Sequence, residues 1–116
     1  MYLSAMLTSL PLEFGPAVQQ IAGLGFMHVD LVAQSSRSAE EREALAQSGL
    51  LVSCVALGRG LPSNQTLDAA DLGLRRAALE EMKAQVRDAA QLGARHAYVI
   101  PGLDASAAGL ARFSEA

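Results

Sequence analysis

Apolar and polar residues follow their most regular order over residues 71–102. Apolar side chains first recur every three or four positions, which predicts an amphipathic helix with one buried face. Asp71 or Asp68 can cap the start of this helix, and Gly93 is typical of its end, because glycine adopts the left-handed conformation without a Cβ penalty. The apolar run 96–100 is too short for a helix and predicts a strand, closed by the Pro-Gly pair that follows. The residues predicted on the buried helix face are Leu79, Met82, Val86, Ala89 and Ala90.

The same succession of helix, glycine and apolar run occurs twice earlier in the chain, with Gly25 and Gly49 at the helix ends. Pro16 suits the first position of the first helix, where its missing N–H costs nothing. Ser38 and Glu41 form a capping-box pattern at the start of the second helix. The predicted strands span about residues 2–8, 27–33, 50–57 and 96–100. Residues 104–116 predict a loop and the opening of a fourth helix, with Leu110 and Phe113 as its apolar contacts.

This repeating order of strand and helix predicts an α/β fold with parallel strands joined by right-handed crossovers. The 116 residues suffice for one domain with a real core. Two architectures are open: the N-terminal half of a (β/α)8 TIM barrel, or a small open flavodoxin-like α/β sandwich. The second requires a strand order that reverses, so that helices cover both faces of the sheet. Residues 58–67 make a longer connection than the usual ~2–6 residues and are a candidate functional loop.

Composition excludes several classes of function. Half of the residues are apolar and the net charge is −3, which is unlike the basic surface of a nucleic-acid-binding protein. No apolar run approaches the roughly 18 residues of a membrane span, and the N-terminus lacks the basic start of a signal peptide. Cys54 is the only cysteine, so an internal disulfide is excluded and a reducing, cytoplasmic location is favoured.

Several segments together resemble one family of proteins. Residues 24–31, LGFMHVDL, resemble the second-strand signature of the xylose-isomerase-like TIM barrels. These include sugar phosphate isomerases and epimerases and the related endonuclease IV-type proteins. Residues 71–80, 89–94 and 99–102 resemble the third helix and fourth strand of the same family, in its order and spacing. Because such a barrel has eight βα units and typically about 250 residues, the resemblance implies a partial barrel domain over residues 1–116.

The resemblance also implies a function. The full-length form would be a sugar or sugar phosphate isomerase or epimerase, acting on a sugar or polyol by metal-assisted proton or hydride transfer. In the family a divalent metal is held on the later strands, so its ligands are expected beyond Ala116, and no catalytic residue is assigned here. The endonuclease branch places metal-binding histidines after the third and fourth strands. This chain has Leu57-Gly58 and Pro101-Gly102 there, with no histidine, which disfavours a nuclease function. The alternative function is a small α/β binding or regulatory module without catalysis.

Four residues are candidate contacts of a small sugar or polyol. Asp30 lies in an otherwise apolar strand, where a carboxylate is costly unless it is paired. The matching family position holds an acid that points into the barrel mouth, although a structural hydrogen bond would also explain Asp30. Arg59, Asn64 and Gln65 lie in the long loop after the third strand. Arg59 could hold a phosphate or carboxylate, and the two amides could bond hydroxyls; the alternative for each is a solvated loop residue.

Three further residues are interpreted as structural. His28 shares the face of Asp30 because side chains alternate along a strand, and a hydrogen-bonded structural role is favoured over catalysis. His96 stands at the start of the fourth strand, at the end away from barrel chemistry. Cys54 lies among apolar neighbours, where thiols are usually inert. A half-barrel would leave two sheet edges and an apolar face open, which predicts self-association.

Overall fold

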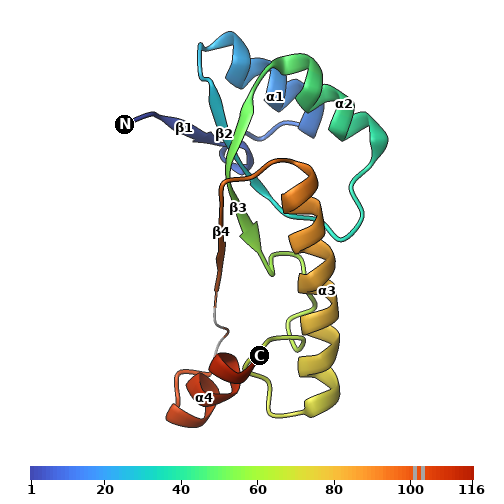
Figure 1. Ribbon diagram of the computed structural model, residues 1–116, viewed down its shortest axis with the longest axis vertical. Coiled ribbons are helices and arrows are strands. Elements are labelled where there is room, and N and C mark those ends of the chain that lie inside the picture. Colours follow the sequence, from blue (N-terminus) through green and yellow to red (C-terminus); the bar gives the residue numbers. More distant parts are fainter. Residues whose placement is uncertain (101, 103) are drawn as a thin grey trace.

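The computed structural model describes residues 1–100, 102 and 104–116 and has the predicted alternation of strands and helices. The strands are β1 (Ser4–Met6), β2 (His28–Val32), β3 (Leu51–Leu57) and β4 (His96–Val99). The helices are α1 (Phe14–Gly23), α2 (Ala39–Ser48), α3 (Leu72–Gln91) and α4 (Ala107–Glu115), and a 3-10 turn, η1 (Leu7–Ser9), follows β1 (Figure 1). Within the described ranges, no helix combines the length and apolar character that crossing a bilayer requires.

The element boundaries agree with the sequence prediction except at the start of the chain. The predicted strands 27–33, 50–57 and 96–100 lie within one residue of β2, β3 and β4 at each end. The first strand is shorter than the predicted 2–8, because the chain turns into η1, closed by a bond from the N–H of Leu10 to the carbonyl of Leu7 at 3.1 Å. The Pro-Gly turn predicted after β4 includes Pro101, which lies outside the described residues.

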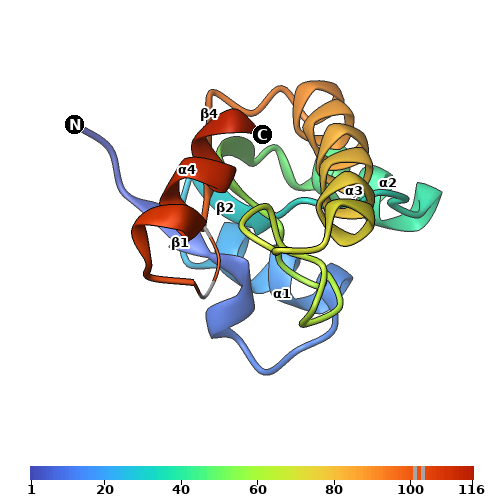
Figure 2. The ribbon, with the colours of Figure 1, turned by 90° about the horizontal axis from the view of Figure 1, so that it is seen from below.

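The four strands form one parallel sheet in the order β1-β2-β3-β4. Right-handed crossovers between strands taken in order put every connecting helix on the same face, and Figure 2 shows α1, α2 and α3 on one side of the strands. A flavodoxin-like sandwich instead has the strand order 2-1-3-4-5 with helices on both faces. That alternative architecture is therefore wrong. The opposite face of the sheet, here called the inner face, corresponds to the interior of a barrel.

The main hydrophobic core lies between the sheet and helices α1 and α2. Side chains alternate along β2, so that Val29 and Leu31 are fully buried toward the helices while His28 and Asp30 lie half-buried on the inner face. The helices contribute the opposite side of this core. Its buried residues are Leu7, Ala17, Val18, Ile21, Val29, Leu31, Ala33, Leu45, Leu50, Val52, Val55 and Ala89.

Two helix starts follow the predicted capping and one does not. The hydroxyl of Ser38 accepts the N–H of Glu41, and a carboxylate oxygen of Asp71 accepts the N–H of Leu74. Each bond satisfies a backbone donor that the first turn of a helix leaves free. The prediction for Pro16 is wrong: α1 begins two residues earlier, at Phe14, and the proline lies inside its first turn, where the missing N–H is still harmless.

Helix α3 has a more polar buried face than the sequence predicts. Met82 and Ala89 are buried as expected, but Ala78, Gln85 and Asp88 are buried with them. Val86, predicted on the buried stripe, is 50% exposed, and Ala90 is also exposed. The buried face is shifted because Gln85 and Asp88 have hydrogen-bond partners in the loops after β3 and β2. These hydrogen bonds offset the loss of hydration when the two polar side chains are buried.

A second, smaller core joins α4 to the rest of the chain. Leu67, Ala78 and Met82 form its buried centre, and Phe113 of α4 and Val99 of β4 pack against it. The predicted apolar contact of Phe113 is thus confirmed, whereas Leu110 is exposed. Figure 1 shows α4 near the loop that leads into α3, at the end of the molecule remote from α1.

Candidate functional site

An open cleft lies at the carboxyl ends of β2 and β3. It has a volume of about 620 Å³ and lies between the loop that follows β2 and the loop that follows β3. In parallel α/β folds, this end of the strands is where ligands bind. The cleft is lined by Val32, Ala33, Gln34, Ser35, Ser36, Arg59, Gly60, Leu61, Pro62, Gln65, Glu81 and Gln85.

One wall of the cleft is the long loop after β3. It begins at Gly58, whose positive φ of 79° turns the chain out of the strand and whose N–H donates to the Gln85 side chain at 2.7 Å. Arg59 follows and is exposed on the cleft wall, and Gln65 is half-buried on the same wall. Asn64 is exposed in the same loop but is not a lining residue. Of the four predicted contact residues, the structure therefore brings Arg59 and Gln65 together on the cleft wall.

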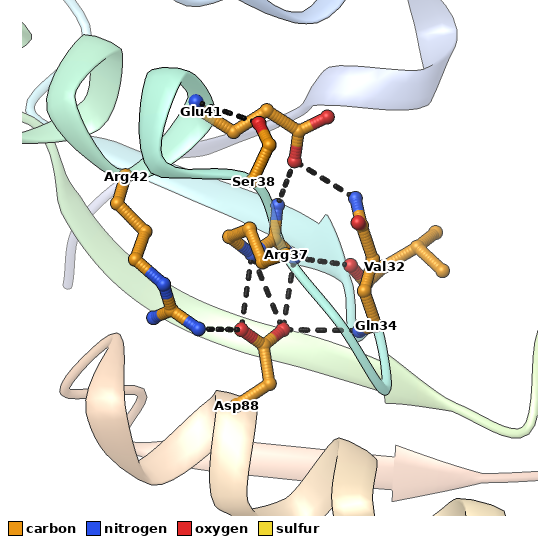
Figure 3. A network of polar contacts seen from close by, with 7 residues as sticks. All are labelled: Val32, Gln34, Arg37, Ser38, Glu41, Arg42 and Asp88. Atoms are coloured by element: carbon orange, nitrogen blue, oxygen red, sulfur yellow. Dashed lines mark hydrogen bonds and ion pairs between the residues drawn. The ribbon is translucent and has the colours of Figure 1, made fainter.

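The opposite wall, residues 32–36, is held by a buried ion-pair network (Figure 3). The guanidinium of Arg37 donates from Nε and Nη2 to the carboxylate of Asp88 on α3, at 3.0–3.2 Å. Its Nη2 also donates to the carbonyl of Val32 at 2.9 Å, and its Nη1 to Glu41 at 2.8 Å. The side chains of Arg37 and Asp88 are 0% and 3% exposed. The fork-shaped geometry fixes the loop because several bonds must break before it can move.

Asp88 is the centre of this network. Besides Arg37, it accepts the backbone N–H of Gln34 at 3.0 Å and a contact from Arg42 at 3.4 Å. The Gln34 side chain in turn donates to Glu41 at 2.9 Å. A buried carboxylate is tolerated only with such a complete set of partners. The network joins the start of α2, the loop after β2 and the last turns of α3 into one support for the cleft.

Asp30 lies on the inner face, one pleat below the cleft. Its Oδ1 accepts the Ser4 hydroxyl at 2.8 Å and the backbone N–H of Cys54 at 3.2 Å. A β-bulge lies at this point: between Val29 and Asp30 the pairing with β3 skips Ser53, so that Asp30 lies opposite Cys54. Asp30 thus has structural partners, and its contact with a ligand stays a prediction.

The three residues interpreted as structural lie on the same inner face. The ring of His28 stacks on Tyr2 with the centroids 4.1 Å apart, and the Tyr2 hydroxyl lies 2.9 Å from that of Ser53. His96 pairs in register with Cys54 and is exposed. Burial, followed by the negative charge of Asp30, raises the pKa of the Cys54 thiol. A raised pKa opposes thiolate formation, which agrees with an unreactive Cys54.

A second polar contact joins the loops after β3 and β4. The carboxylate of Asp68 accepts the backbone N–H of Asp104 at 2.7 Å, and Arg112 of α4 donates to the carbonyl of Asp68 at 2.6 Å and to the Asp104 carboxylate. The Thr66 hydroxyl and then the Asp104 N–H lower the pKa of Asp68 below its ordinary value. The prediction that Asp68 could cap α3 is therefore replaced by a role as a link between loops.

The residues present do not make a metal centre. In the described part of the chain, no three His, Cys, Asp or Glu side chains converge in a way that could hold a metal ion. Asp30, Cys54 and His96 occupy neighbouring register positions but do not form such a group. The divalent metal implied by the sequence resemblance thus has no ligand set among these residues, and we derive no chemical step through it.

Comparison with known proteins decides the architecture. No protein-family model and no curated protein sequence matches the chain. Among solved structures, it is similar to D-psicose 3-epimerase crystallised in the presence of D-fructose, with a TM-score of 0.77 and 19% sequence identity. The similarity covers 99% of this chain and 45% of the epimerase chain. The fold is that of half a TIM barrel. At this identity the comparison establishes the fold and leaves the activity to be argued from the site.

Sequence reasoning missed the network that supports the cleft. In the sequence, Asp88 lies off the predicted apolar stripe of α3, and Arg37 lies in the polar segment between the second strand and the second helix. The only available signal is the Arg37–Glu41 spacing of four residues across the start of α2. The decisive partner lies 51 positions away in the sequence, and no local pattern identifies a contact of that range.

Proposed function

We propose that this chain forms a substrate-binding half of a (β/α)8 isomerase or epimerase that acts on a sugar, a polyol or a sugar phosphate. The observation that carries the proposal is the open cleft at the carboxyl ends of β2 and β3, with Arg59 and Gln65 on its wall. The fold similarity to a D-psicose 3-epimerase supports the substrate class. The cleft has polar groups of both signs, which suits a ligand with many hydroxyls.

The proposed roles follow from the chemistry of the side chains. Arg59 would hold a phosphate, carboxylate or hydroxyl of the ligand, because its guanidinium presents several donors in one plane. Gln65 and the exposed Asn64 would donate to and accept from hydroxyl groups. Asp30 would contact the part of the ligand that reaches below the cleft into the barrel interior. Proton transfer is not assigned to this chain, since its described residues include neither a metal-ligand group nor a free acid–base pair in the cleft.

Binding of D-fructose, D-psicose and D-fructose 6-phosphate to the purified 116-residue chain tests the proposal. We expect saturable binding by NMR or calorimetry, weakened about tenfold in Arg59→Ala, because a hydrogen bond to a charged group contributes roughly 1.5–3 kcal/mol. Arg76→Ala is the matched control, since Arg76 is exposed on α3 and does not line the cleft. Absence of binding by all three ligands, with the chain folded by circular dichroism, would contradict the proposal.

A second readout separates catalysis from binding. Epimerisation beside a ketone removes and returns a carbon-bound proton, so an active protein incorporates solvent deuterium into the sugar. We expect binding without deuterium incorporation by this chain alone, with or without added Mg²⁺ or Mn²⁺. Binding without exchange also agrees with the alternative of a non-catalytic binding module. If the wild type incorporates deuterium and Asp30→Asn does not, Asp30 would instead have a catalytic role.

A further inference from the structure

One side of the cleft comes from helix α3, which brings two polar side chains to it. Glu81 and Gln85 lie four positions apart, on the same face of the helix, and both line the cleft. Neither belongs to the four contact residues that the sequence predicted. All residues that line the cleft lie between Val32 and Gln85, so the arrangement is formed by segments that the structure describes.

Gln85 is a buried amide of which only one half has a structural partner. The residue is 4% exposed, and its Oε1 accepts the N–H of Gly58 at 2.7 Å. This bond fixes the orientation of the amide, because only its oxygen can accept a hydrogen bond. The amide nitrogen has no partner among the described residues, none of whose fully buried polar side-chain atoms lacks one. The nitrogen is therefore accessible, and it can donate to a ligand in the cleft that Gln85 lines.

Glu81 supplies an acceptor beside this donor. It is half-buried on the cleft wall, and within the described ranges its carboxylate takes part in no ion pair. The preceding residue, Glu80, is different, because it is exposed and pairs with Lys83 at 2.8 Å. A carboxylate only accepts hydrogen bonds and an amide nitrogen only donates them. Together the two groups match neighbouring hydroxyls, each of which can donate and accept.

We propose that Glu81 and Gln85 bind adjacent hydroxyl groups of the ligand and make the cleft select a neutral sugar or polyol over a sugar phosphate. Glu81 accepts a hydrogen bond from one hydroxyl, and Nε2 of Gln85 donates to the oxygen of the next. The inference rests on the proposed function and narrows its substrate class.

The charges around the cleft favour this selection. Arg59 and Glu81 are the charged side chains among the described lining residues, so the cleft has no excess of positive charge, and the carboxylate repels a phosphate. Arg37 does not compensate, because all three nitrogens of its guanidinium already donate to groups of the protein. The N–H of Gly58 is likewise taken, by Gln85. A phosphate site normally offers several cations or free backbone N–H groups.

The ratio of two dissociation constants tests the selection. We expect calorimetry to show that the wild-type chain binds D-fructose about tenfold or more tightly than D-fructose 6-phosphate. Glu81→Gln removes the negative charge and keeps the size of the side chain, so the ratio should fall about tenfold. Glu80→Gln is the matched control, because it makes the same change outside the cleft, and it should leave the ratio unchanged.

The outcomes distinguish this inference from the proposed function. Tighter binding of the phosphate by the wild type, or the same ratio in Glu81→Gln and Glu80→Gln, would overturn the inference and leave the proposed function in place. Absence of binding by both sugars would overturn the proposed function, and this inference with it.

Nuclear magnetic resonance tests the direct contact of Gln85. Its side-chain amide resonances, assigned by triple-resonance experiments, should shift when the wild-type chain is saturated with D-fructose. Gln85→Glu keeps an oxygen for the N–H of Gly58 and removes the amide donor, so D-fructose should bind about tenfold more weakly. If this variant does not fold, the wild-type resonances still decide the question. Amide resonances of Gln85 that stay in place at saturation would overturn its role.

Discussion

At the residue scale, Arg37 and Asp88 form the most deeply buried ion pair of the described residues. Both side chains are almost completely buried, and the pair connects the cleft wall at Val32 to the body of α3. The ring of Phe14 covers the guanidinium of Arg37 at 5.3 Å, which adds a cation–π contact. Loss of either partner would leave the other buried charge with only a more exposed partner, Glu41 for Arg37 or Arg42 for Asp88, so this pair is a better target than any surface ion pair.

We therefore expect Asp88→Asn to lower the free energy of unfolding by about 3 kcal/mol, the size typical of breaking a buried ion pair. Urea unfolding followed by circular dichroism measures this change. Lys83→Ala is the control, because it removes an exposed ion pair with Glu80 on the same helix and should leave the stability nearly unchanged. Equal stability of Asp88→Asn and the wild type would show that the network does not hold the loop.

At the element scale, two connections determine the shape of the cleft end. The loop after β2 is tied to α3 by the buried network, and the loops after β3 and β4 are tied together by Asp68. The strands and helices form from local pattern, but these loops are positioned by side chains from other elements. The stability of these loops should consequently depend on the charge of the carboxylates that bind them.

For Asp68, the direction in which stability changes with pH can be worked out. Its pKa is lower in the folded protein than its ordinary value, because Thr66 and the Asp104 N–H stabilise the carboxylate. Its contribution is therefore fully present above about pH 4, near the unfolded pKa, and is lost as the pH falls through the folded pKa. We expect Asp68→Asn to melt at a lower temperature than the wild type at pH 7, with the difference shrinking as the pH falls below about 4. A difference that stays constant with pH would show that the Asp68 charge is not involved; Glu115→Gln, exposed on α4, is the control.

At the scale of the whole molecule, the described part of the chain is a sheet with one well-covered face. Its helices bury one side of the sheet, while β1 and β4 each pair with a neighbouring strand on one side only.

The sequence by itself determined the elements and their class. Period-two and period-3.6 patterns, helix-ending glycines such as Gly49, and the Ser38 and Asp71 caps are local properties, so strands β2 to β4 and the extent of α3 follow from neighbouring residues alone. The resemblance to the xylose-isomerase-like barrels implied a barrel half beside the open-sandwich alternative, and the consecutive strand order confirms the barrel half. Arg59 and Gln65 were identified from the length of the loop that contains them, and their binding role stays a prediction.

Only the tertiary structure decided which polar residues are buried and which candidates share a site. Asp88 is charged and its immediate neighbours in the sequence are ordinary helix formers, so its burial depends on Arg37, 51 positions away. Asp30 accepts the N–H of Cys54 at the β-bulge where the β2–β3 pairing skips Ser53, a contact between residues 24 positions apart. Strand order likewise excluded the flavodoxin-like sheet. The physical reason is common to all three: hydrogen bonds and strand pairing join residues by position in space, and local periodicity contains no information about distant partners.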